Sequence, residues 1–203
     1  MEKRLAQIIS YLFHPLLIPS YTLLIVFNAN AYFVFALPFT AKLLMLIMMV
    51  VSTVCIPILL FIIFRYRRII VDFQMKTKEE RMYPYLSITC VYFITYYLFS
   101  KLQIPPIFNF YLLIATLLSL VLLFINLIYK ISGHTAAMGG ITGLCIGLYF
   151  QFNLNLLFVI LMLIFCSGLV GFARLKLNSH KPSEVYSGFL VGVVIFLAMT
   201  LII

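Results

Sequence analysis

Charged residues are the scarcest class in this 203-residue sequence, at 9% of the chain, and their scarcity excludes a water-soluble protein. A soluble domain needs roughly a quarter of its residues charged to cover its surface. Here 65% of the residues are apolar and the mean hydropathy is +1.19. Several apolar runs reach or approach the ~20 residues that cross a bilayer as a helix. The composition therefore predicts an integral membrane protein.

Alternation of apolar and polar residues is also lacking, which excludes a transmembrane β-barrel. Runs such as LLMLIMMVVSTVCIPILLFIIF, residues 43–64, are continuously apolar. We expect an all-α fold, a polytopic transmembrane helix bundle of six to seven spans. The expected spans are 15–34, 42–64, 85–100, 107–129, 135–151, 154–172 and 185–203. No internal repeat is visible, so 1–203 is expected to form a single membrane-embedded domain, with 2–13 a candidate interfacial amphipathic helix.

Cysteine is sparse, and its placement indicates neither disulfides nor metal ligands. The four cysteines all lie inside apolar runs without paired spacing and are expected to act as small hydrophobic residues: Cys55, Cys90, Cys145 and Cys166. The basic start of the chain is not followed by a small-residue cleavage site, so we expect no cleavable signal peptide.

Acidic residues are few, five against fourteen basic residues, and the charges are distributed unevenly. With the expected spans, only Lys42 and Lys101 lie on one side of the membrane. All five acids and the remaining basic residues lie on the other side. Such a face attracts anionic headgroups or phosphorylated substrates. We therefore expect membrane lipids and a phospholipid or polyprenyl phosphate as partners, and no nucleic acid. The sequence does not indicate an oligomeric state.

The same asymmetry bears on orientation. The positive-inside rule places the charged face in the cytoplasm, in a protein of the cytoplasmic (inner) membrane. The alternative, an extracytoplasmic face, stays open because some of these basic residues can serve chemistry instead of topology.

Three polar clusters fall on the charged face. The first, RYRRIIVDFQMKTKEERMYPY (65–85), is typical of a stop-transfer loop whose arginines anchor to headgroups. The second, ISGH (131–134), precedes glycines at 139, 143 and 147, a spacing that lets membrane helices approach closely. A helix beginning near Ser132 or Gly133 would offer free N–H groups to an anion. The alternative is that Ser132 only caps this helix and His134 sits at the interface.

The third cluster, ARLKLNSHKPSEV (173–185), places Arg174, His180 and Glu184 together. Arg174 and the lysines have an ordinary interpretation as residues that extend to the interface. A cationic pocket with two histidines and a carboxylate is also what phosphoryl transfer requires, since one imidazole can attack phosphorus and another can protonate the leaving oxygen. His14, in FHPLLIP, is expected either at the interface or beneath this face.

These motifs resemble the type 2 phosphatidic acid phosphatases (PAP2), in the superfamily of acid phosphatases and vanadium haloperoxidases. The signature of that family is K-x6-R-P, then P-S-G-H, then S-R-x5-H-x3-D. The corresponding segments here are Lys76 to Pro84, Ile131 to His134, and Ala173 to Glu184. The third segment, with its fixed spacing, is the specific one. The resemblance implies a PAP2-like helical bundle and a divergent member of the family.

The resemblance also implies roles. His180 would be the nucleophile that forms a phosphohistidine, Glu184 would orient its ring, and His134 would be the general acid. The phosphate would be held by groups from all three motifs: Lys76, Ser132, Gly133 and Arg174. Arg81 is a further candidate for phosphate binding, which the signature itself does not contain. No metal and no cofactor are implied.

Four positions depart from the signature. Tyr83 stands where the family has arginine; Arg81 is the candidate substitute, although on a regular helix it lies about 140° around from Lys76. Ile131 replaces proline, Ala173 replaces serine, and Glu184 replaces aspartate. The leading hypothesis is a membrane phosphatase acting on a lipid-linked phosphate mono- or diphosphate ester. The alternatives are a catalytically inactive phospholipid-binding or transport protein with a similar pocket, which the Tyr83 departure favours, and a purely structural multi-pass protein.

Overall fold

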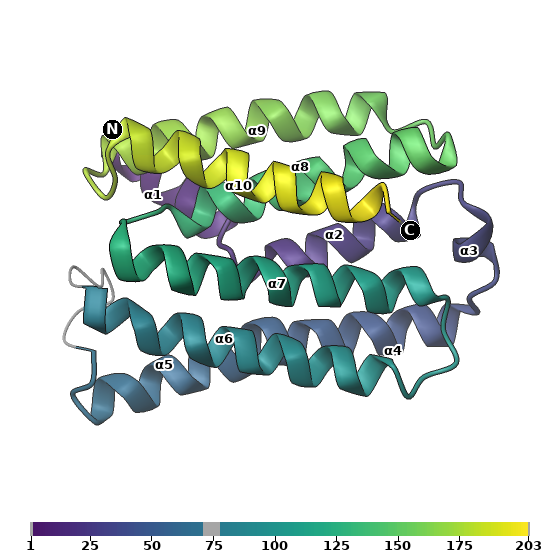
Figure 1. The fold of residues 1–203 in the computed structure, drawn as a ribbon, viewed down its shortest axis with the longest axis horizontal. Coiled ribbons are helices and arrows are strands. Elements are labelled where there is room, and N and C mark those ends of the chain that lie inside the picture. The colour runs from purple at the N-terminus through teal and green to yellow at the C-terminus, as the bar shows by residue number, and fades with distance from the viewer. Residues whose placement is uncertain (1, 71–77, 203) are drawn as a thin grey trace. The chain divides into compact units, whose positions relative to one another are not determined.

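The computed structural model describes residues 2–70 and 78–202, and within these ranges its regular structure is entirely helical (Figure 1). The helices are α1 Glu2–Leu12, α2 Ile18–Phe27, α3 Tyr32–Phe35, α4 Phe39–Val50, the π-helical turn η1 Val51–Cys55, α5 Ile56–Tyr66, α6 Lys78–Phe99, α7 Pro106–Ile128, α8 Gly133–Phe152, α9 Leu157–Lys176 and α10 Pro182–Thr200. The prediction of an all-α protein is confirmed for this part of the chain, and α1 matches the predicted amphipathic helix.

Five of these helices are long and apolar enough to cross a membrane. They are Phe39–Tyr66, which runs through α4, η1 and α5, and then α7, α8, α9 and α10. They correspond to five of the seven predicted spans. Helix α6 has 22 residues and covers the predicted span 85–100 to within one residue, but it is less apolar and is not among these five. Five apolar helices make this a multi-pass membrane protein.

The predicted span 15–34 is wrong as a single helix. The structure divides it into α2, of 10 residues, and the short α3. A helix of 10 residues is only about 15 Å long, half the thickness of the hydrocarbon core. The Asn28 side chain donates a 2.8 Å hydrogen bond to the carbonyl of Leu24 and so competes with the helical backbone where α2 ends.

The longest span contains a local defect with an identifiable cause. Pro57 has no N–H and its ring crowds the carbonyl one turn earlier, so a regular α-helix cannot continue through it. The chain widens instead into the π-helical turn η1, immediately before the proline. Thr53, in this turn, is completely buried.

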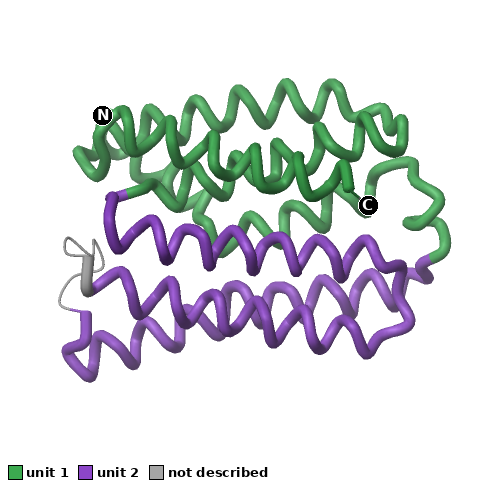
Figure 2. The backbone as a smooth tube through the Cα atoms, in the orientation of Figure 1, with its two compact units in different colours: residues 1–36, 131–203 green, residues 37–130 purple. Residues whose placement is uncertain are grey.

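The chain divides into two compact units, shown in Figure 2. Unit 1 comprises residues 1–36 and 131–203, and unit 2 comprises residues 37–130. In unit 1, α8 packs against α10, α9 and α2, while α1 packs against α9. In unit 2, α6 packs against α7, α5 and η1, and the Thr89 and Ser119 hydroxyls of α6 and α7 lie 3.0 Å apart.

The contact between α8 and α10 depends on glycine. A Cβ atom built on Gly192 would lie 2.7 Å from the backbone nitrogen of Gly140, and one on Gly143 would lie 2.9 Å from the Cα of Val193. Real Cβ atoms do not approach backbone this closely. The glycine ladder predicted on α8 is therefore confirmed as a close helix contact, and α10 contributes matching glycines to it.

Candidate functional site

The candidate site is built where α8 begins, α9 ends and α10 begins, all within unit 1 (Figure 1). Ser132 is fully buried and is the N-cap of α8, where its Oγ accepts a hydrogen bond from the Thr135 N–H at 3.5 Å. Its own N–H donates to the Glu184 carbonyl at 3.1 Å. This bond joins the start of α8 to the first turn of α10, although the two residues are far apart in the sequence.

His180 and Glu184 form the best-defined pair of the site. His180 Nδ1 lies 2.7 Å from Glu184 Oε2, and only 10% and 9% of the two side chains are exposed. Glu184 Oε2 also accepts the Lys181 N–H at 3.3 Å. Pro182 occupies the first position of α10, which places Glu184 in the first turn and directs its carboxylate back to the residue four positions earlier.

This geometry determines the chemical form of the His180 ring. A carboxylate can only accept, so a proton on Nδ1 faces Glu184 and the ring lone pair lies on Nε2. The carboxylate also stabilises positive charge on the imidazole, as in the histidine–carboxylate pairs of hydrolases. Because the pair is almost completely buried, this stabilisation is screened little by water.

His134 lies in the first turn of α8, directly after the Ser132 cap. Its side chain hydrogen-bonds to the backbone of Ser10, and Arg174 and His180 lie within electrostatic range of it. Arg174 comes from the last turn of α9. The chain then turns through Asn178, at a φ of 52°, and the Ser179 N–H donates to the Arg174 carbonyl at 3.1 Å. This short turn returns the chain to His180.

His14 is the member of the site that the three motifs did not contain. It lies between α1 and α2, and its ring centroid is 5.1 Å from that of His134, with the planes at 80°. Its Nδ1 accepts the Leu16 N–H at 3.3 Å, so a neutral ring carries its proton on Nε2. Burial, and then the Arg174 guanidinium, lower the pKa of His14 to about 4. His14 is therefore uncharged at neutral pH.

The structure brings most of the predicted site residues together in unit 1. Ser132, Gly133, His134, Arg174, His180 and Glu184 all lie where these three helices meet. Lys76 lies outside the described residues. Arg81 lies in α6, in unit 2, where it is buried. The proposed roles of Lys76 and Arg81 stay predictions. Tyr83 packs its ring against Phe64 of α5, with 6.3 Å between centroids.

Every charged residue of unit 1 lies at this end. They are Glu2, Lys3, Arg4, Arg174, Lys176, Lys181 and Glu184. The ion pair between Glu2 and Lys176 ties the first turn of α1 to the last turn of α9. Five of these seven residues are basic, so this end favours an anionic ligand. Within residues 2–70 and 78–202, no three or more His, Cys, Asp or Glu side chains are grouped so that they could hold a metal ion.

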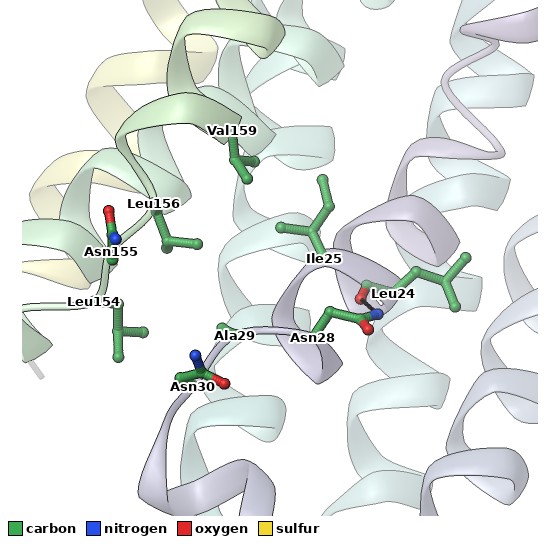
Figure 3. A pocket seen from close by; sticks show the side chains of 9 residues that line it. All are labelled: Leu24, Ile25, Asn28, Ala29, Asn30, Leu154, Asn155, Leu156 and Val159. Atoms are coloured by element: carbon green, nitrogen blue, oxygen red, sulfur yellow. Dashed lines mark hydrogen bonds between the residues drawn. The ribbon is translucent and has the colours of Figure 1, made fainter.

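A pocket of about 360 Å³ lies elsewhere in unit 1, where α2 ends and α9 begins (Figure 3). Its lining is uncharged, with three asparagines among aliphatic residues: Leu24, Ile25, Asn28, Ala29, Asn30, Leu154, Asn155, Leu156 and Val159. Since α9 runs from this pocket to Arg174, about one helix length of 30 Å separates it from the histidines. The pocket is distinct from the candidate site.

The fold and the site together define a multi-pass helical membrane protein with a buried histidine–carboxylate pair at its charged end. The chain matches no protein-family model, no curated protein and no solved structure. Its function is therefore argued from the site itself.

Proposed function

We propose that the chain is a metal-independent membrane phosphatase that hydrolyses a lipid-linked phosphate mono- or diphosphate ester through a phosphohistidine. The observation that carries this proposal is the 2.7 Å bond between His180 Nδ1 and Glu184 Oε2 in a nearly buried site. A buried carboxylate that holds one ring nitrogen makes the other a better nucleophile. The resemblance to type 2 phosphatidic acid phosphatases supports the same assignment.

The first step joins His180 to phosphorus. Nε2 attacks the phosphorus atom, the bond from phosphorus to the leaving oxygen breaks, and His134 donates a proton to that oxygen. Glu184 stabilises the positive charge that develops on His180. Arg174 and the N–H groups of the first turn of α8 stabilise the phosphoryl oxygens, on which negative charge is concentrated.

The second step releases phosphate. His134, now neutral, accepts a proton from a water molecule as the water attacks phosphorus. The bond between Nε2 and phosphorus then breaks, and inorganic phosphate leaves. Both histidines return to their starting protonation states, so the cycle consumes one water for each ester bond that is cleaved.

The position of these groups supports a lipid substrate. They stand at the ends of helices that are apolar enough to cross a membrane, where lipid headgroups are found. The five basic residues of unit 1 at this end suit a phosphorylated headgroup, while the acyl or prenyl chain stays in the bilayer. By the positive-inside rule, we propose that this end faces the cytoplasm.

The proposal is tested with protein purified in detergent and a panel of lipid phosphates, comprising a phosphatidate, a phosphatidylglycerol phosphate and a polyprenyl diphosphate. We expect phosphate release by the wild type and a loss of at least about a thousandfold in His180→Ala, because the nucleophile is removed. Glu184→Gln keeps the size of the side chain but not its charge, and we expect a loss of about a hundredfold or more. Equal release by wild type and His180→Ala contradicts the proposal.

A different outcome would support the inactive binding protein. In that case vanadate or phosphate binds to the wild type and binds more weakly to Arg174→Ala, while no lipid phosphate is hydrolysed. Chemical trapping provides a third measurement, because a phosphohistidine is stable to alkali and labile to acid. Mass spectrometry of the rapidly quenched enzyme should find the phosphoryl group on His180.

Orientation is tested by thiol labelling in intact cells, in a background with the four native cysteines replaced. Lys181→Cys lies beside the site, and Asn155→Cys lies at the opposite end of α9; both positions are exposed. We expect an impermeant reagent to label Asn155→Cys from outside and to leave Lys181→Cys unlabelled. The reverse pattern would place the site outside the cytoplasm.

A further inference from the structure

Each histidine of the proposed reaction has an orienting partner, and the two partners are of different kinds. His180 is held by the Glu184 carboxylate at 2.7 Å. His134 has no carboxylate among its described contacts; it meets the backbone of Ser10 and the ring of His14. Both of these contacts come from the N-terminal segment of the chain, which the three motifs do not include.

The contact with Ser10 follows from the end of a helix. Ser10 lies in the last turn of α1, where carbonyl groups lack a helical N–H partner. Its carbonyl is therefore the backbone group suited to accept from an imidazole N–H. A ring nitrogen that donates to this carbonyl carries a proton, and the tautomer of a neutral His134 is then determined in the same way that Glu184 determines that of His180.

The contact with His14 restricts the plane of the ring. The two rings meet edge to face, at 80° and 5.1 Å, so rotation of His134 about χ2 would drive its ring into His14. His14 is itself held by the Leu16 N–H, which bonds to its Nδ1 at 3.3 Å. Its uncharged state at neutral pH matters here, because a second cation beside Arg174 would repel a protonated His134.

Helix α1 is in turn fixed to the body of unit 1. Ala6 and Ser10 are buried on the side that packs against α9, and Glu2 pairs with Lys176 at the end of α9. The opposite side of α1 exposes Leu5, Ile8 and Tyr11. Since Arg174 lies in the last turn of α9, the docking of α1 on α9 brings Ser10 and His14 to the site.

We propose that Ser10 and His14 are part of the active site, and that His14 is a positioning residue that holds His134 in the orientation needed to protonate the leaving oxygen. This inference rests on the proposed function and adds to it a residue outside the resemblance. The charged and titratable groups that face His14 and His134 are Arg174 from α9 and His180 from the turn before α10, and His180 is paired with Glu184.

The chain has three histidines, so the test can observe each one separately. Protein labelled with ¹⁵N-histidine is studied in detergent, where nitrogen chemical shifts report the tautomer of each ring. His14→Gln removes the ring but keeps an acceptor near the Leu16 N–H, and His14→Phe keeps a ring of similar size. Ile8→Ala, on the exposed side of α1 and outside the contacts with His134, is the control that should leave activity and all three histidines unchanged.

In the wild type, measured at a pH at which the His134 ring is neutral, we expect a single tautomer for His134. In His14→Gln we expect a mixture of tautomers at His134 and a decrease in kcat of about tenfold with little change in KM, since a misplaced catalytic group slows the chemical step. His14→Phe should lose less activity and keep one His134 tautomer. His180 should keep its proton on Nδ1 throughout, which also shows that the site is folded. His14→Asn is made in parallel and replaces His14→Gln if that variant loses the His180 signature.

Two results would overturn the proposal. One is an unchanged His134 tautomer and unchanged kcat in His14→Gln. The other is an equal loss in His14→Phe and His14→Gln, because the ring contact would then have no role. If the wild type hydrolyses no lipid phosphate, the proposed function fails. The tautomers still decide, without an activity measurement, whether His14 orients His134.

Discussion

In soluble proteins the more apolar of two helices is usually the more buried one. Two membrane spans of this protein show the reverse. The Phe39–Tyr66 helix of unit 2 has a mean hydropathy of 2.9, yet only 22% of its apolar stretch is buried within the protein. Helix α8 of unit 1 has a mean hydropathy of 1.2, and 67% of its apolar stretch is buried. In a bilayer, moving an apolar side chain from the lipid-facing surface into the protein interior gains little free energy, because both environments are apolar. Membrane helices therefore associate through close packing of small residues.

The same difference in burial explains where polar functional side chains lie in this protein. Helix α8 is surrounded because its glycines let α10 approach, and the buried start of α8 holds Ser132 and His134. The bulky aliphatic residues of Phe39–Tyr66 face outward, among them Leu59 and Ile62. Polar side chains at membrane depth require a protein environment, and in unit 1 the glycine contact provides it.

The largest expected effect tests the glycine contact. In Gly192→Ala the new methyl group would lie 2.7 Å from the Gly140 nitrogen, and backbone cannot move aside as a flexible side chain can. We expect a loss of about 3 kcal/mol in the free energy of unfolding in detergent. The matched control is Gly168→Ala on α9, where the new methyl group would meet nothing within 4 Å beyond the adjoining backbone of its own helix. It should be neutral or slightly stabilising. Equal stability of the two variants contradicts the comparison.

A second effect, of up to about 3 kcal/mol at pH 4, should appear as pH dependence. The unfolded chain takes up a proton on His14 below about pH 6.5, whereas the folded protein does so only near its pKa of about 4. Stability should therefore decrease as the pH falls from 6.5 to 4. In His14→Phe this part of the dependence should be absent, which thermal unfolding across this range would show. Identical slopes in the two proteins would mean that His14 does not contribute.

A smaller effect is expected from the polar contact of unit 2. Thr89→Val removes the hydroxyl that lies 3.0 Å from Ser119, and hydrogen bonds between membrane helices contribute about 0.6 kcal/mol on average. The proposed phosphatase activity should be unchanged. A stability loss as large as that of Gly192→Ala would show that unit 2 depends on this polar contact as much as unit 1 depends on its glycine contact.

The smallest effect is expected on the lipid-facing side of the longest span. Leu59 is 59% exposed, so Leu59→Ala exchanges one apolar surface for another within lipid. We expect a change of less than about 0.5 kcal/mol. Unfolding measurements in detergent would check this, and a loss above about 1.5 kcal/mol would indicate that a partner covers this face.

Much of the helical structure was predictable because hydrophobic runs and helix caps are local signals. The Ser132 cap, the start of α10 at Pro182 and the pairing of His180 with Glu184 all involve residues within four positions of each other. The prediction of one continuous span over 15–34 was wrong because it relied on the length of the apolar run and gave too little weight to the asparagines at 28 and 30. Hydropathy alone does not show that the Asn28 side chain competes with the backbone for the Leu24 carbonyl.

The role of His14 was not predictable in the same way. Its position on the charged side followed from counting spans, but its contact with His134 joins residues 120 positions apart. That contact depends on how α1 docks on α9, through Ala6, Ser10 and the pair of Glu2 with Lys176. An amphipathic pattern indicates that a helix has two faces, and it does not indicate which neighbour covers either face.

By itself, the sequence determined a helical membrane protein, most of its spans and the gathering of the charges of unit 1 at one end, and the resemblance of its motifs implied the His180–Glu184 pair. These depend on hydrophobic length, on charge and on contacts within one helical turn, all of which act over a few residues. Only the tertiary structure decided that Ser132 bonds to the backbone of Glu184, that Gly192 meets Gly140, and that His14 lies against His134. Such contacts require two backbones to fit each other at close range, and that fit belongs to the pair of segments and not to either one alone.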